Sequence, residues 1–331
     1  MENTNLDIPV RKMENICERI LTENSGAYDD ASSRAELNEL IHSFLNQQTH
    51  SGDADDWHNL AVTLSIRDEY KLACDILTCG IKYFPKNVDL LADYLLYGID
   101  CGKTEQCKKI SQDLLSIPKR LWTWRGFSFL TDYILQTEAL YAETDEALDS
   151  ILEKLLNIVH EYRKLFPLFE DSYKVEATIY KKLNMSDKYI MILEQAMEQI
   201  PACPKCALMY ADSMFESSNY QKALKGVTRS IADSSQIKQS AHDGYLYFLH
   251  GLCIIADAQK NNDNLNKDII INIYSDFNMA LSFYDNSVGS GKVINYKDVI
   301  KNKILYLINR YHINIPEEDV ALQNLVNELN L

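Results

Sequence analysis

A repeated register of large and small side chains is the feature of this sequence that most constrains its fold. From Trp57, a Leu-Ala pair follows at +3 and +4, a leucine at +7, small residues at +16 and +23, and Pro85 at +28. Small residues let two antiparallel helices approach closely, large ones fill the space between them, and proline ends the second helix. The register therefore predicts a pair of helices over residues 54–87.

The same register occurs in two further, adjacent copies, whose matching residues are Tyr173, Ala177, Tyr180, Leu193, Ala196 and Pro201, then Ala207, Tyr210, Ala211, Met214, Tyr220 and Ala223. Three copies that keep one phase resemble the 34-residue tetratricopeptide (TPR) repeat. The resemblance implies an all-α fold: a right-handed α-solenoid of about seven antiparallel helix pairs, with degenerate terminal units. No strands are expected.

The remaining segments are predicted to be degenerate or capping units. Residues 88–120 carry Gly98 where a large residue is expected, and two longer helices are predicted over residues 121–142 and 145–166. Because a repeat cannot bury its face alone, helical caps are expected at both ends. The predicted organisation is one continuous solenoid, with N-terminal capping helices in 1–50 (helices 8–23 and 33–48), TPR-like repeats in 51–286, and C-terminal capping helices in 287–331.

Charge and hydropathy restrict the classes of partner. The net charge is −15 and the isoelectric point is about 4.9. Such a field repels nucleic acid and anionic lipid headgroups, so neither is an expected partner. No run approaches the ~20 apolar residues of a membrane span, and the first residues lack the order of a secretory signal. We expect a cytoplasmic protein, and the Asn-, Ile-, Lys- and Tyr-rich composition hints at a bacterial genome.

Motifs for catalysis or metal binding are sparse. Cys203 and Cys206 form a CxxC pair and are the only candidates for metal or redox chemistry, but a structural zinc site normally needs a second pair. The eight cysteines are more simply interpreted as reduced thiols in helix cores. There is no HExxH, GxxxxGK[ST] or GxSxG motif. We therefore expect no enzyme, no cofactor and no metal; catalysis by Cys203 or Cys206 is a remaining alternative.

The family resemblance also indicates which residues face a partner, because positions 2, 5, 9 and 12 of each TPR unit line its concave surface. In the copy at 54–87 these are Asp55, His58, Val62 and Ser65. Later units add Asp171 and Ile255 and a predicted partner-binding groove made of Lys174, Thr178, Lys181, Lys205, Leu208, Asp212, Phe215, Tyr245, Phe248 and Leu252. The lining is cationic in the middle and apolar toward its C-terminal part, which suits a peptide with an acidic end and a hydrophobic end.

The function that follows is a non-catalytic adaptor or scaffold that holds a protein or peptide. Two alternatives stay open. A ligand- or peptide-responsive regulator would need a separate effector, since no basic recognition helix occurs in residues 1–50. The helices predicted in 295–331 could instead fold over Tyr245, Phe248 and Leu252. A clamp for chaperone C-termini is disfavoured, because His58 and Val62 stand where its cation and amide would be. Partner identity and oligomeric state are left open.

Overall fold

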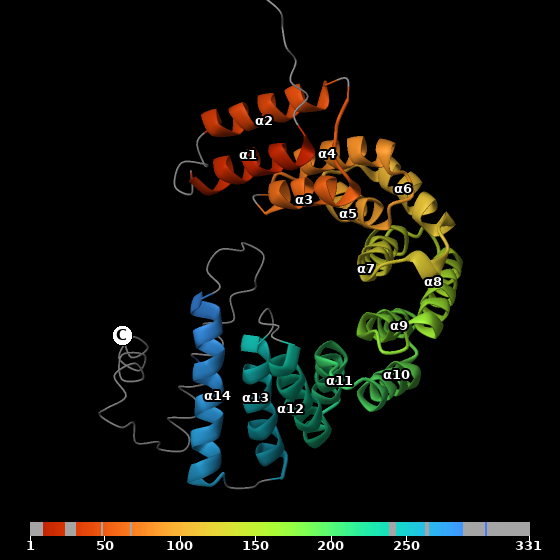
Figure 1. Cartoon of the computed structure of the whole chain (residues 1–331). Helices are drawn as coiled ribbons and strands as arrows, with labels where there is room; N and C mark the ends of the chain where they lie inside the picture. The colour runs from red at the N-terminus through yellow and green to blue at the C-terminus, as the bar shows by residue number, and fades with distance from the viewer. Residues whose placement is uncertain are drawn as a thin grey trace, which may run out of the picture. The chain divides into compact units, whose positions relative to one another are not determined.

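A computed structural model describes residues 9–23, 31–47, 49–66, 68–237, 243–261, 265–286 and 302. These residues form fourteen α-helices, one short 3-10 helix and one π-helical segment, with no strand among them (Figure 1). The predicted all-α class is confirmed. The chain divides into two compact units, residues 1–167 and 168–331, and each is described by itself.

The first unit consists of four successive helix pairs. Its elements are α1 (Val10–Glu23), α2 (Ala31–Leu45), α3 (Ala54–Ser65), α4 (Tyr70–Tyr83), α5 (Val88–Asp100), α6 (Thr104–Ser116), the 3-10 helix η1 (Lys119–Leu121), α7 (Trp124–Tyr133), the π segment η2 (Ile134–Glu138) and α8 (Asp145–Leu165). The two helices of each of the first three pairs contact each other, and α8 contacts η1 and η2. Helix α3 also contacts α1 and α5, the first helices of the neighbouring pairs. This is the stacking of hairpins that the repeat register predicts.

The second unit continues the same plan with three pairs. They are α9 (Glu170–Lys182) with α10 (Ser186–Gln199), α11 (Pro204–Glu216) with α12 (Tyr220–Ile237), and α13 (Asp243–Asn261) with α14 (Lys267–Asn286). Helices α11 to α14 follow one another side by side (Figure 1), and α9 also contacts α11. The first helices of the three pairs, α9, α11 and α13, are the elements predicted to carry the concave lining.

Side-chain caps fix the start of several helices. At α3, the Asp56 amide donates to Asp53 Oδ1 over 3.0 Å, and the Asp53 amide donates to Asp56 Oδ2 over 3.1 Å. This reciprocal pair satisfies two amides that have no partner inside the helix. Asn87, Thr123 and Thr144 each accept a hydrogen bond from the amide three residues later, at the starts of α5, α7 and α8. The local sequence therefore sets these boundaries.

Packing of a large against a small residue holds the first strong repeat together. Trp57 of α3 is 1% exposed and lies over Gly80 of α4. A β-carbon at Gly80 would lie 3.0 Å from the Trp57 side chain, which is tighter than most real contacts. The Trp57 ring also stacks on Tyr83, with centroids 5.9 Å apart. The two helices approach closely because Gly80 has no side chain.

Gly98 explains the degenerate register of residues 88–120. A β-carbon at this position of α5 would lie 2.5 Å from Cys107 Sγ of α6. Cys107 is fully buried, so the sulfur occupies the space that a large side chain at Gly98 would take in a standard repeat. In this pair the bulkier of the two side chains therefore lies on α6, not on α5.

Two predicted helix boundaries need correction. The helix expected over 121–142 begins at Trp124, after η1, and passes into η2 at Ile134, where the Ala139 amide bonds to the Ile134 carbonyl over 2.8 Å. Such wider turns are local rearrangements of backbone hydrogen bonds that apolar periodicity does not reveal. The N-terminal helices run over 10–23 and 31–45. The capping helices predicted in 287–331 lie outside the described residues.

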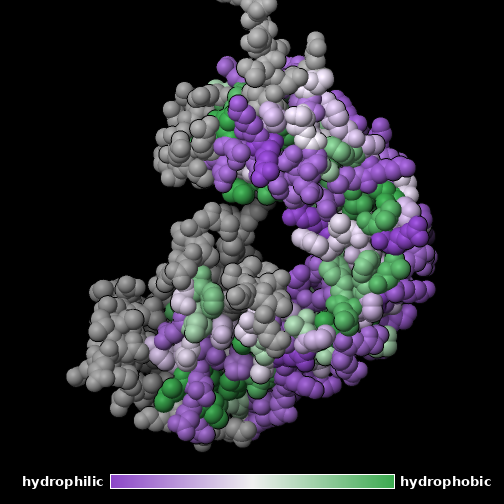
Figure 2. All heavy atoms as spheres, in the orientation of Figure 1, coloured by the Kyte–Doolittle hydropathy of each residue, from purple (hydrophilic) through white to green (hydrophobic). Residues whose placement is uncertain are grey.

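On the face shown in Figure 2, hydrophobic residues form separate patches between hydrophilic ones. A search of the described helices finds none long and apolar enough to cross a membrane.

Candidate functional site

Four of the predicted groove residues line one cavity in the second unit. Lys181 of α9, Asp212 and Phe215 of α11, and Tyr245 of α13 surround a space of about 380 Å³. We call it the inner cavity; its other lining residues are Tyr189, Met209 and Glu216. It brings together side chains from the first helices of three consecutive pairs. The repeat register did not identify these three residues because it assigns only positions 2, 5, 9 and 12 of each first helix to the concave face. Met209 and Glu216 occupy other positions of α11, and Tyr189 belongs to α10, the second helix of its pair.

Hydrogen bonds order the wall of the inner cavity. The Tyr245 hydroxyl donates to Asp212 Oδ1 over 2.7 Å, which joins α13 to α11. The Tyr189 hydroxyl donates to the Met209 carbonyl over 3.1 Å and joins α10 to α11. Lys181 Nζ lies 5.9 Å from the centroid of the Tyr189 ring. The cavity therefore has a fixed aromatic wall and a carboxylate held in place by a neutral hydroxyl.

The electrostatic environment of the inner cavity is negative. Burial raises the pKa of the Asp212 carboxyl, the hydrogen bond from Tyr245 opposes this rise, and the nearby Glu216 carboxylate adds to it. Burial also raises the pKa of Tyr189 to about 12, with further contributions from Asp212 and Glu216. A phenol resists ionisation when negative charges lie close to it. Two carboxylates, Asp212 and Glu216, line the cavity together with one lysine, Lys181, so the net charge of its lining is negative.

Two further residues of the predicted lining, Lys205 and Thr178, have partners within the unit. Lys205 Nζ lies 2.8 Å from Asp171 Oδ1. Burial lowers the pKa of Lys205, but the hydrogen bond and the charge of Asp171 raise it, and the net pKa is above its usual value. The Thr178 hydroxyl donates to the Lys174 carbonyl over 2.9 Å. Lys174 and Leu208 are partly buried. None of these five residues is among those that line the inner cavity.

The predicted apolar end of the groove is largely built into the core. Phe248 of α13 is 5% exposed and packs in a cluster with Ile273 and Phe277 of α14. Leu252 packs against the same cluster. Phe248, which the register assigns to the groove, is therefore covered by α14. The sequence register could not reveal this, because a residue's position in a repeat does not determine how the following helix packs.

Several inner-face residues of the first unit are joined by polar contacts between successive first helices. His58 Nδ1 of α3 and Arg125 Nη1 of α7 both contact the carboxylate of Asp93 on α5, the arginine at 3.2 Å. Asp93 is fully buried. The Ser65 hydroxyl donates to the Tyr97 hydroxyl over 3.1 Å. The side chains of successive first helices neutralise one another here.

Cys203 and Cys206 lie at the start of α11 and have a structural role there. Both thiols are fully buried, and burial raises the pKa of Cys203 to about 12 and that of Cys206 well above its usual value. Their amides donate to carboxylates, Cys203 to Asp233 over 2.9 Å and Cys206 to Glu170 over 2.8 Å. A nucleophilic or metal-binding thiol needs to be ionised and accessible. Within the described part of the chain, no group of three or more His, Cys, Asp or Glu side chains is placed to hold a metal ion.

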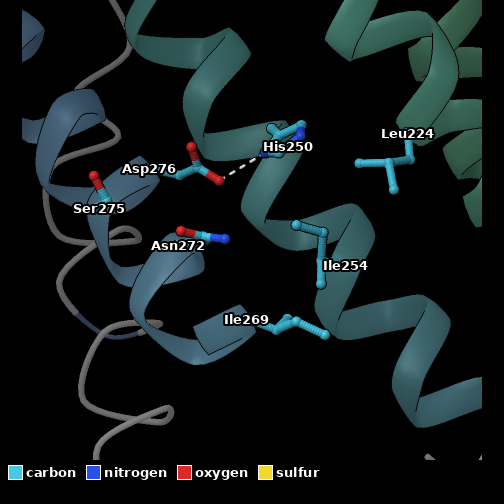
Figure 3. A pocket seen from close by; sticks show the side chains of 7 residues that line it. All are labelled: Leu224, His250, Ile254, Ile269, Asn272, Ser275 and Asp276. Carbon is cyan, nitrogen blue, oxygen red and sulfur yellow. Dashed lines mark hydrogen bonds and ion pairs between the residues drawn. The ribbon is translucent and has the colours of Figure 1, made fainter. Parts of the chain in front are cut away.

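A second cavity, of about 450 Å³, lies among α12, α13 and α14 (Figure 3). His250 Nδ1 of α13 is 2.6 Å from Asp276 Oδ2 of α14, and Leu224 of α12 faces them across the space. Ile254, Ile269 and Asn272 line it too. The sequence offered no signal for this pairing, because His250 and Asp276 stand on different helices separated by an insertion. The cavity combines an aliphatic wall with one imidazole.

Comparison with solved structures returns helical-repeat proteins. A thermophilic TPR protein of Thermus thermophilus is 16% identical, with 61% of this chain and 99% of that chain covered and a TM-score of 0.48. A TPR protein of Parabacteroides merdae is 15% identical, with 89% and 100% covered and a TM-score of 0.47. The Cut9-Hcn1 assembly is 9% identical, with 92% and 53% covered and a TM-score of 0.47.

No protein-family model matches the sequence, and no curated protein matches it. The assignment to a TPR-like helical-repeat fold therefore stands on the chain's own features. The repeat register, the close helix contacts at Gly80 and the ordered series of hairpins all agree with that fold. Proteins built this way act generally as interaction scaffolds, because stacked pairs present an extended surface.

Proposed function

We propose that this protein is a non-catalytic scaffold that holds a peptide segment of a partner protein on the face formed by α9, α11 and α13. The observation that carries the proposal is the convergence of Lys181, Asp212, Phe215 and Tyr245 on the inner cavity. These residues come from three consecutive hairpins. A segment that contacts all of them has to lie across the repeats.

The chemistry of the wall supports a peptide partner. Aromatic side chains and methionine are enriched in protein interfaces, and partly buried aromatic rings are frequent binding anchors. Phe215, Tyr245 and Met209 supply this surface beside hydrogen-bonding groups. The net charge of −15 favours a protein partner over nucleic acid. Because Tyr245 and Tyr189 are fixed by hydrogen bonds, little conformational entropy has to be lost on binding.

Selection from a random peptide display library on the purified full chain tests the proposal. Peptides that bind the wild type should lose about tenfold or more in affinity for Phe215→Ala, the loss typical of an interface anchor. Met191→Ala is the matched control: Met191 lies in the same unit on α10, is 56% exposed and does not line the cavity. It should leave binding unchanged. Selected peptides that bind Phe215→Ala as well as they bind the wild type would refute the site.

A further inference from the structure

Two carboxylates line the inner cavity, and neither forms an ion pair with another described residue. Among the described residues, Asp212 has one hydrogen-bond partner, the neutral Tyr245 hydroxyl, and forms no ion pair. Glu216, at the end of the same helix, is exposed and also forms no ion pair within the described part of the chain. Lys181 lowers the pKa of Asp212 through space, without a direct contact between the two side chains.

Three buried aspartates of this chain each have a cationic partner. Asp93 contacts Arg125 at 3.2 Å, Asp171 contacts Lys205 at 2.8 Å, and Asp233 contacts Arg229 at 2.7 Å. A carboxylate removed from water is costly unless it is paired, so these contacts are the expected arrangement. Asp212 has no such cationic partner among the described residues and lies on a cavity, where a cation from outside the chain could reach it.

We propose that the inner cavity accepts a basic side chain, preferably arginine, of the bound peptide; the inference rests on the proposed function. The guanidinium pairs with the carboxylates of Asp212 and Glu216. Its methylene groups pack against Met209, and its plane lies against the aromatic wall of Phe215 and Tyr245.

The geometry of the wall favours arginine over lysine. Guanidinium is planar, presents several donors and is more weakly hydrated than an ammonium group, so it stacks on aromatic rings and bridges two acceptors. The cavity of about 380 Å³ provides the rings of Phe215 and Tyr245 next to both carboxylates. This chemistry reverses the sequence-based expectation of an acidic peptide end at Lys174, Lys181 and Lys205. Lys205 already pairs with Asp171, and Lys174 does not line the cavity.

The library selection also tests this inference, through the composition of the peptides whose binding depends on Phe215. These peptides should contain an essential arginine or lysine. Replacing that arginine by citrulline, which keeps the shape and removes the charge, should weaken binding about tenfold, and replacing it by lysine should cost about threefold. On the protein side, Asp212→Asn should weaken binding about tenfold and the exposed Glu216→Gln about threefold. Circular dichroism shows whether the variants keep the wild-type fold.

A double-mutant cycle distinguishes pairing from indirect effects. If arginine pairs with Asp212, the citrulline peptide should bind Asp212→Asn and wild type with nearly the same affinity. Binding should also weaken as ionic strength rises. Phe215-dependent peptides without a needed basic residue, or equal binding of the arginine and citrulline peptides, would overturn the inference and leave the scaffold function standing. If no selected peptide depends on Phe215, the proposed function itself falls, and this inference falls with it.

Discussion

Adding one methyl group at Gly98 should destabilise the first unit, although alanine is the better helix former. The new β-carbon would lie 2.5 Å from Cys107 Sγ, well inside the 3.4 Å at which ordinary contact begins. Overpacking of this kind costs about 1–3 kcal/mol, and alanine recovers about 0.5–1 kcal/mol of helix propensity. Gly98→Ala should therefore lower the free energy of unfolding by about 1 kcal/mol, and by no more than about 2.5 kcal/mol.

The cause can be isolated by removing the sulfur. In a Cys107→Ala background the methyl group at Gly98 has room, so Gly98→Ala should become stabilising by about 0.5–1 kcal/mol. Gly102→Ala is a matched control, because Gly102 has φ +67° and no atom near its missing β-carbon. That substitution strains the backbone without a clash. Its cost should be the same with or without Cys107→Ala.

Tryptophan fluorescence is a selective assay for this cycle. All three tryptophans, at 57, 122 and 124, belong to the first unit. Urea denaturation followed by their emission therefore reports the unfolding of that unit. Two results would refute the close-approach explanation. One is a coupling free energy below about 0.5 kcal/mol between Gly98→Ala and Cys107→Ala. The other is that Gly98→Ala stabilises the protein when Cys107 is present.

Two further predictions concern charged groups. Tyr245→Phe removes the hydrogen bond that favours ionised Asp212, so the already raised pKa of Asp212 should rise further; carbon-detected NMR titration of labelled aspartate measures it, and an unchanged or lower pKa would contradict the assignment. Asp93→Asn leaves Arg125 without its buried carboxylate and should cost about 2–4 kcal/mol in the same fluorescence assay. A cost below about 0.5 kcal/mol would mean that the pair is energetically neutral.

The sequence determined the fold class because the residues that pack two helices of a pair together are close in sequence and recur at a fixed spacing. Trp57, Gly80 and Pro85 lie within one repeat, so their spacing alone predicts a helix pair and its boundary. The first-helix positions also identified Lys181, Asp212, Phe215 and Tyr245, which the structure brings to one cavity. Each of these residues lies on the same face of its own helix, and helical periodicity alone determines which residues share a face.

Only the tertiary structure decided what those side chains contact. The repeat register assigns Phe248 to the groove, but α14 covers this side chain. At Gly98, the space beside the backbone is occupied by Cys107 of the next helix. The sequence also did not reveal the net charge of the inner cavity. Lys205 is neutralised by Asp171, whereas Asp212 receives only a hydroxyl from Tyr245, 33 residues away. Such pairings depend on the separation and rotation of neighbouring helices. Periodicity along the chain fixes the face that a residue occupies and leaves open which partner meets it there.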